Sequence, residues 1–246
     1  MENILDEIDK FGQALAHAAQ PFIDDVENND EKRAKMREVI RNILFDESGD
    51  RNLGIDVSQR ERTLQKMLSG FAEIKNAYIV LNDVAVYIKR FPNKNLKVPK
   101  SRFLKYHVGN YLNEIYILRE RLESYQKIIT RAYKHDSRLE GLASQLKKLD
   151  VLLSGFDNII KLRGQHVHQE RYNDENFDRL YFYEMMVENN VDVFGDMYSI
   201  ALRDYRQKWL KTIQANNNSI KEILSRYFAI LYPIAFNEKG DWVTPI

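Results

Sequence analysis

Arg163 and His168 are the residues of this chain whose types and spacing best suit a chemical reaction, with four residues between them. An arginine can hold a phosphate group through two parallel hydrogen bonds. A histidine, whose unperturbed pKa is about 6.5, can exchange a proton near neutral pH. Together they are the minimal equipment for cutting RNA without a metal ion. Arg102 and His107 have the same spacing, so the surrounding sequence has to decide between the two pairs.

The pattern before Arg163 indicates a core helix that leads into the first pair. Apolar residues recur at helical spacing over 142–160, and the next step of that pattern falls on Arg163. Gly164 follows, which predicts that the helix ends or kinks there. This break is needed, because residues five apart on an ideal helix are rotated by about 140° and would not reach one phosphate. By contrast, His107 beside Phe103 is typical of a partly buried core histidine with a hydrogen-bond partner.

Periodicity in the rest of the chain predicts an all-α protein. One apolar stripe predicts a helix of about 30 residues that begins after Pro99, with Ser101 as its N-cap. This stripe consists of Leu104, Val108, Tyr111, Ile115, Leu118, Leu122, Tyr125 and Ile129. The polar stretch 134–138 is short, so we expect this helix and the one over 142–160 to form an antiparallel hairpin.

Further helices are expected on both sides of this hairpin, and strand alternation is nearly absent. Their expected ranges are 4–19, 31–44, 61–88, 174–187, 193–214 and 219–232, with a turn at 215–219. We expect an N-terminal helical region over 1–99, packed on a helical bundle over 100–246, within one continuous domain.

Composition narrows the class of protein. The net charge is +1, so no global basic field indicates nucleic-acid binding, and an RNA site would have to rest on a local patch. The chain has no cysteine, which excludes disulfides and thiolate metal sites. The acidic start at 1–7 is unlike a secretory signal, and the apolar stretch 228–236 is too short to span a bilayer. We expect a soluble cytoplasmic protein.

Motifs for several common chemistries are missing from the sequence. No phosphate-binding glycine loop, His-Glu-x-x-His zinc motif, di-iron Glu-x-x-His pair or Gly-x-Ser-x-Gly motif is present. His166 and His168 could supply half of a metal site, but no third ligand follows at a recognisable spacing. We therefore expect neither a metal nor a cofactor.

The pair at Arg163 and His168 resembles the motif of the HEPN superfamily (higher eukaryotes and prokaryotes nucleotide-binding domains). That family has Arg-x4-6-His near the end of a core helix. Here the pair is preceded by 156–162 and followed by an acidic turn and another expected helix, and a second likeness lies at 103–111. The resemblance covers roughly residues 100–232. This chain departs from the family pattern at Gly164, where the family often has Asn or another polar residue, and at Glu170, where one toxin branch has Tyr.

The resemblance implies an up-down helical bundle of HEPN type with additional N-terminal helices. It also implies a metal-independent endoribonuclease that acts as a homodimer with its two motifs facing each other, in defence or in a stress response. Arg163 would stabilise the charge on the pentacovalent phosphate, and His168 would move the proton as the 2′-hydroxyl attacks. The product would carry a 2′,3′-cyclic phosphate. The expected substrate contacts are Lys161, Gln165, His166 and Arg171.

A second function stays open at this point. A catalytically inactive HEPN-like module could bind RNA, a nucleotide or a partner protein. Gly164 and the near-zero net charge favour this alternative, whereas the intact Arg163 and His168 pair favours the enzyme. Four tyrosines at helical spacing could stack on RNA bases, although such aromatic residues more often pack a bundle or a dimer surface. They are Tyr181, Tyr183, Tyr198 and Tyr205.

Overall fold

The protein is an all-α helical bundle, as its sequence periodicity predicts. A computed structural model describes residues 5–45, 58–90, 98–136, 141–157 and 175–245. The helices in these ranges are α1 (Leu5–Glu27), α2 (Asp30–Phe45), α3 (Gln59–Lys89), α4 (Lys100–Tyr133), α5 (Leu142–Leu153), the 3-10 helix η1 (Ser154–Phe156), α7 (Glu175–Glu188) and α8 (Phe194–Ala235). Apart from an isolated β-bridge between Phe236 and Trp242, the described backbone pairs only within helices and turns.

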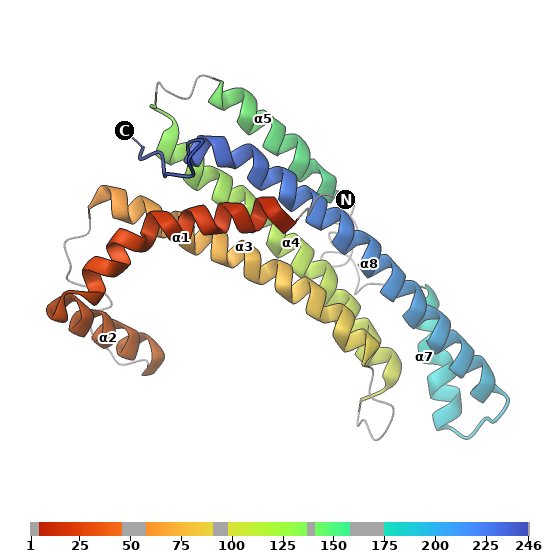
Figure 1. The fold of residues 1–246 in the computed structure, drawn as a ribbon. Coiled ribbons are helices and arrows are strands. Elements are labelled where there is room, and N and C mark those ends of the chain that lie inside the picture. The colour runs from red at the N-terminus through yellow and green to blue at the C-terminus, as the bar shows by residue number, and fades with distance from the viewer. Residues whose placement is uncertain (1–4, 46–57, 91–97, 137–140, 158–174, 246) are drawn as a thin grey trace.

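Three long helices, α3, α4 and α8, form the body of the bundle (Figure 1). α1 packs against α3 and α8, and α2 packs against α1 at one side of the molecule. α5 lies along the second half of α8, while α7 lies along its first half. None of the helices in the described ranges is long and apolar enough to cross a membrane.

Four helices meet in the core around Phe11 of α1. Its ring centroid lies 5.9 Å from that of Phe71, 6.3 Å from that of Tyr125 and 4.9 Å from that of Phe228. Gly70 lets Tyr125 approach α3, because a Cβ atom at this position would lie only 2.5 Å from the tyrosine ring. Residues from both sides of position 99 therefore share one hydrophobic cluster.

The long apolar stripe is confirmed in helix α4, but the N-cap of this helix differs from the prediction. Every residue predicted for the stripe is at most 1% exposed. The helix begins at Lys100 with Pro99 at the N-cap position, so the expectation that Ser101 caps it is wrong. The Ser101 hydroxyl instead donates to the carboxylate of Glu184, which accepts backbone N–H groups of the first turn. A side chain from α7 has taken the role that a local cap would have had.

α4 and α5 are antiparallel, as expected. Gln126 Nε2 donates to Asp150 Oδ1 at 2.9 Å, and seven residues earlier on α4, Arg119 pairs with Asp157 seven residues later in the chain. Partners that shift in opposite directions define an antiparallel pair. The apolar pattern of the second helix is also confirmed over its described part, since Leu149, Leu153 and Phe156 are buried. The backbone tightens to a 3-10 turn at 154–156.

The expected turn at 215–219 is absent, because α8 runs unbroken through it. Asn217 is buried there, and its Oδ1 accepts a hydrogen bond of 2.8 Å from the Tyr111 hydroxyl. Its Nδ2 donates to Asn82 Oδ1 at 3.1 Å. These contacts join α8 to α4 and α3. Tertiary hydrogen bonds therefore override the turn preference of the asparagine run.

The N-terminal helices occur where they were expected, with one longer than predicted. α1 continues through Pro21 to Glu27 instead of ending near residue 19, and this extension buries Val26. α3 begins with a capping box that the sequence signature Ser-x-x-Glu encodes. The Ser58 hydroxyl accepts from the Glu61 N–H, and the Glu61 carboxylate accepts from the Ser58 N–H.

Replacing Asn217 with alanine should lower the free energy of unfolding by about 1–3 kcal/mol, because it removes the main hydrogen-bond acceptor of the buried Tyr111 hydroxyl. Urea unfolding followed by circular dichroism measures this. Asn218→Ala is the matched control, since Asn218 is exposed on the next position of the same helix, and it should unfold at an unchanged or slightly higher urea concentration. Equal losses in both variants would contradict a role for the Asn217 contacts.

Candidate functional site

The predicted site residues lie outside the described part of the chain. Arg163 and His168, and the expected substrate contacts Lys161, Gln165, His166 and Arg171, all belong to residues 158–174. Their relative geometry therefore stays a prediction. The structure does describe the two points that flank this segment, Asp157 and Glu175. Both flanking elements pack against α4.

Arg119 holds the first flanking point on α4. Its Nη2 lies 3.5 Å from Asp157 Oδ1 and 3.0 Å from Glu123 Oε1. The Arg119 Nε is buried and has no hydrogen-bond acceptor among the residues that the structure describes. One guanidinium thus joins the end of η1 to the middle of α4, and the chain leaves the described range directly beside it.

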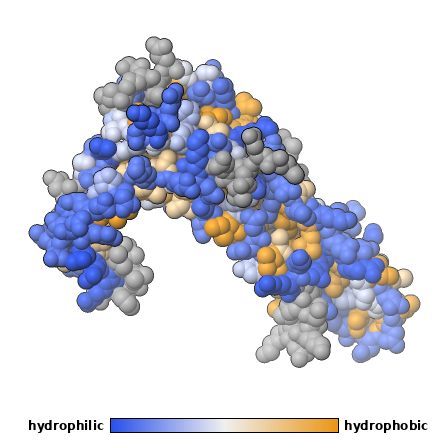
Figure 2. Space-filling view, in the orientation of Figure 1, coloured by the Kyte–Doolittle hydropathy of each residue, from blue (hydrophilic) through white to orange (hydrophobic). Residues whose placement is uncertain are grey.

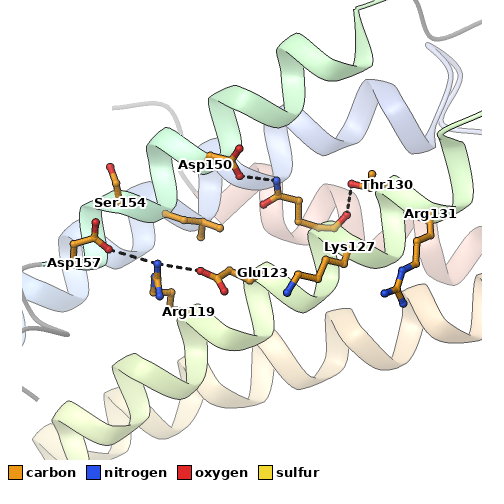
Figure 3. A pocket seen from close by; sticks show the side chains of 10 residues that line it. Arg119, Glu123, Lys127, Thr130, Arg131, Asp150, Ser154 and Asp157 are labelled. Carbon is orange, nitrogen blue, oxygen red and sulfur yellow. Dashed lines mark hydrogen bonds and ion pairs between the residues drawn. The ribbon is translucent and has the colours of Figure 1, made fainter. Parts of the chain in front are cut away.

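An open cavity of about 450 Å³ lies along this junction of α4 and α5 (Figure 3). Its described lining is Arg119, Glu123, Gln126, Lys127, Thr130, Arg131, Asp150, Leu153, Ser154 and Asp157. Lys127 and Arg131 project the same way from α4. Both are exposed, and neither has an ion pair within the described ranges. They are the lining cations that remain available to an anionic ligand.

This lining can hold a ligand, and its described residues include no histidine. Three carboxylates balance its three cations, so the cavity as described has no strong net charge. Its two hydroxyl side chains already donate to backbone carbonyls, Thr130 to Gln126 O at 2.7 Å and Ser154 to Val151 O at 2.7 Å. A histidine for proton transfer would have to come from outside this described set.

Glu184 holds the second flanking element, α7, on the start of α4. The carboxylate is only 7% exposed. It accepts hydrogen bonds from Lys100 N at 2.7 Å and Ser101 N at 3.2 Å, and Tyr198 of α8 donates to it at 2.6 Å. Burial, together with this hydrogen bond to the carboxylate, raises the pKa of Tyr198. Lys105 of α4 adds a cation–π contact, with its Nζ 5.9 Å from the Phe177 ring centroid.

The competing pair, Arg102 and His107, lies on α4, and the His107 ring packs among aromatic side chains. The His107 ring lies 4.3 Å from Phe103 and 5.5 Å from Tyr87, measured between ring centroids. Its burial is partial, as expected, and lowers its pKa. The expected hydrogen-bond partner is not found for this ring within the described ranges; aromatic contacts surround it instead.

Three of the four candidate tyrosines contribute to packing. Tyr205 is buried, with its ring centroid 4.5 Å from that of Phe177. Tyr198 binds Glu184, and Tyr183 packs against Phe194 at 5.9 Å. Tyr181 differs, since 52% of it is exposed. It is the member of the set with a surface open to a base or to another protein.

The cations beside Asp157 were not singled out from the sequence, although a signal for them exists. Arg119, Lys127 and Arg131 recur at helical spacing along α4, next to the apolar stripe. Glu184 also had a signal, because it continues the buried pattern of Phe177 and Leu180 at the same spacing. A charged residue on an apolar stripe indicates a buried partner.

No group of three or more His, Asp or Glu side chains in the described ranges is arranged to hold a metal ion. Comparisons of the chain with protein-family models, with curated proteins and with solved structures found no match. The residues and their geometry are therefore the basis for assigning a function.

Proposed function

We propose that the protein is a metal-independent endoribonuclease of HEPN type, with Arg163 as the phosphate-binding group and His168 as the proton-transfer group. The observation that carries the proposal is this Arg-x4-His pair at the end of an apolar helical pattern in an all-α chain. The other expected contacts to the RNA are Lys161, Gln165, His166 and Arg171.

The packing of the flanking helices supports this proposal. Arg119 contacts Asp157, just before residues 158–174, and Lys105 contacts Phe177, just after them. These two contact points lie about 20 Å apart along α4. Lys127 and Arg131 line the same cavity as Asp157, toward its other end (Figure 3), where they can contact the phosphates of an RNA strand. These two exposed side chains offer local contacts to phosphate despite a net charge of +1 for the whole chain.

The proposed reaction needs no bound metal. The RNA 2′-hydroxyl attacks the adjacent phosphorus, the bond to the 5′-oxygen of the next nucleotide breaks, and a 2′,3′-cyclic phosphate forms. A proton leaves the 2′-hydroxyl and another reaches the departing 5′-oxygen. His168 performs one of these transfers, and the same residue of a second copy can perform the other. Arg163 stabilises the negative charge on the phosphate oxygens.

A second copy of the chain is part of the proposal, and the surface of α7 and α8 supports it. Exposed apolar side chains occur from the second turn of α7 to the second turn of α8, and Figure 2 shows orange surface mixed with blue at this end of the molecule. They are Tyr181, Phe182, Met185, Val191, Val193, Met197 and Ile200. An apolar surface of this kind favours association with another protein surface. Because α7 follows residues 158–174 directly, a dimer through this surface would bring two Arg163 and His168 pairs near each other.

The enzyme is tested by incubating the purified chain with single-stranded RNA in EDTA. We expect cleavage by the parent protein and a loss of about 100-fold or more in His168→Ala, which removes the proton-transfer group. His107→Gln is the matched control, because His107 has the same spacing from an arginine, and its rate should stay unchanged. If the parent leaves varied RNAs intact while it binds them or a nucleotide, the catalytically inactive module is the correct function.

The dimer is tested by placing a charge on its proposed surface. Ile200→Glu should convert the protein from dimer to monomer in sedimentation velocity and reduce RNA cleavage. Ile79→Glu is the matched control, since Ile79 on α3 is 50% exposed and Ile200 is 51% exposed. A monomeric parent protein, or a dimer that survives Ile200→Glu, would argue against this surface.

A further inference from the structure

The start of α4, the end of α3 and the first half of α8 lie near the lower right of Figure 1. A second pocket, of about 400 Å³, is lined there by residues of α4 and α8. Three cations line it, Lys100, Arg203 and Arg206, and Leu202 and Leu210 add apolar surface. Its described lining includes no carboxylate. A pocket with cations and an apolar wall suits a ligand that has both an anionic group and a flat or apolar part.

Both arginines line this pocket from the same face of α8. Arg206 Nε donates to Ile88 O at 2.9 Å, and its Nη2 donates to Lys89 O, so these bonds hold the guanidinium beside the end of α3. Arg203 Nε lies 3.4 Å from Asp204 Oδ1, and both side chains are more than 60% exposed, which makes this pair weak. Two arginines and one lysine thus line one small volume.

The carboxylate of Glu184, which is buried near this pocket, already accepts hydrogen bonds from other groups. Glu184 accepts from the backbone N–H groups of Lys100 and Ser101, from the Ser101 hydroxyl and from Tyr198. Its charge therefore stabilises the N-terminus of α4. The Lys100 side chain makes no ion pair within the described ranges and remains available to a ligand.

We propose that this pocket binds a phosphate group carried by a nucleotide or by an RNA strand. Arginine and lysine together provide the forked and the point-charge donors that phosphate oxygens accept. Leu202 and Leu210 provide apolar surface for the attached base or ribose. The pocket volume falls within the range of about 300–1,000 Å³ that holds small ligands. No bond is made or broken at this site.

This binding does not depend on RNA cleavage. Lys100 and Arg119 are separated by about 30 Å along α4, so the pocket is distinct from the cavity beside Asp157. A chain that cleaves no RNA can still bind phosphate here, and a chain that cleaves RNA need not. The two proposals can therefore fail separately.

The test compares two variants of equal charge change. Lys100→Ala combined with Arg203→Ala removes two pocket cations. The control combines Lys208→Ala with Arg179→Ala, two exposed residues that do not line the pocket; Lys208 lies about 200° around α8 from Arg206. The probes are adenosine 5′-monophosphate, measured by calorimetry, and a single-stranded 2′-O-methyl RNA, measured by fluorescence anisotropy. The 2′-O-methyl group blocks cleavage by the neighbouring hydroxyl, so only binding is measured.

We expect affinity for at least one probe to fall about tenfold or more in the pocket variant and to stay within about twofold in the control, with unchanged thermal midpoints without ligand. Binding of the mononucleotide alone would identify a free nucleotide as the ligand, and binding of the RNA alone would identify a strand. Absence of binding to both probes, or equal losses in the two variants, would overturn the proposal, since equal losses indicate a general charge effect.

Discussion

The buried carboxylate of Glu184 is the contact on which the arrangement at one end of the molecule depends. It accepts hydrogen bonds from the first turn of α4 and from Tyr198 of α8, and it belongs to α7. A single anion therefore satisfies a helix N-terminus and joins three helices. The position of α7 determines where residues 158–174 rejoin the bundle, and the start of α4 borders the basic pocket. Elements that border both proposed sites thus meet at this one contact.

Much of the fold could be predicted from the sequence because apolar spacing along the long helices is regular. The stripe from Leu104 to Ile129 predicts α4, and its residues are buried as expected. The start of this helix was predicted less well, because its cap comes from Glu184, far away in the sequence. Local rules identify a local cap such as the Ser58 and Glu61 box, but they cannot identify a donor or acceptor that tertiary packing brings in.

The asparagine run at 216–218 also shows that local sequence rules miss contacts made by tertiary packing. Its composition favours a turn, yet Asn217 meets Tyr111 and Asn82 from two other helices and stays helical. The basic pocket between α4 and α8 differs in a similar way from the Arg163 and His168 pair. Residues close in sequence can be recognised as a motif, whereas Lys100 and Arg203 come together only when α4 packs beside α8. The sequence therefore indicates the chemistry of the first site and conceals the second.

The most direct measurement of the central claim, metal-free cleavage by the RNA 2′-hydroxyl, uses one substituted RNA. The cleavage position is first mapped on an all-ribose strand in EDTA, and the nucleotide on its 5′ side is then replaced by its 2′-deoxy form. We expect the substituted strand to stay intact at that position and the ribose strand to yield a 2′,3′-cyclic phosphate by mass spectrometry. Cleavage of both strands at the same position and rate would contradict the proposed reaction.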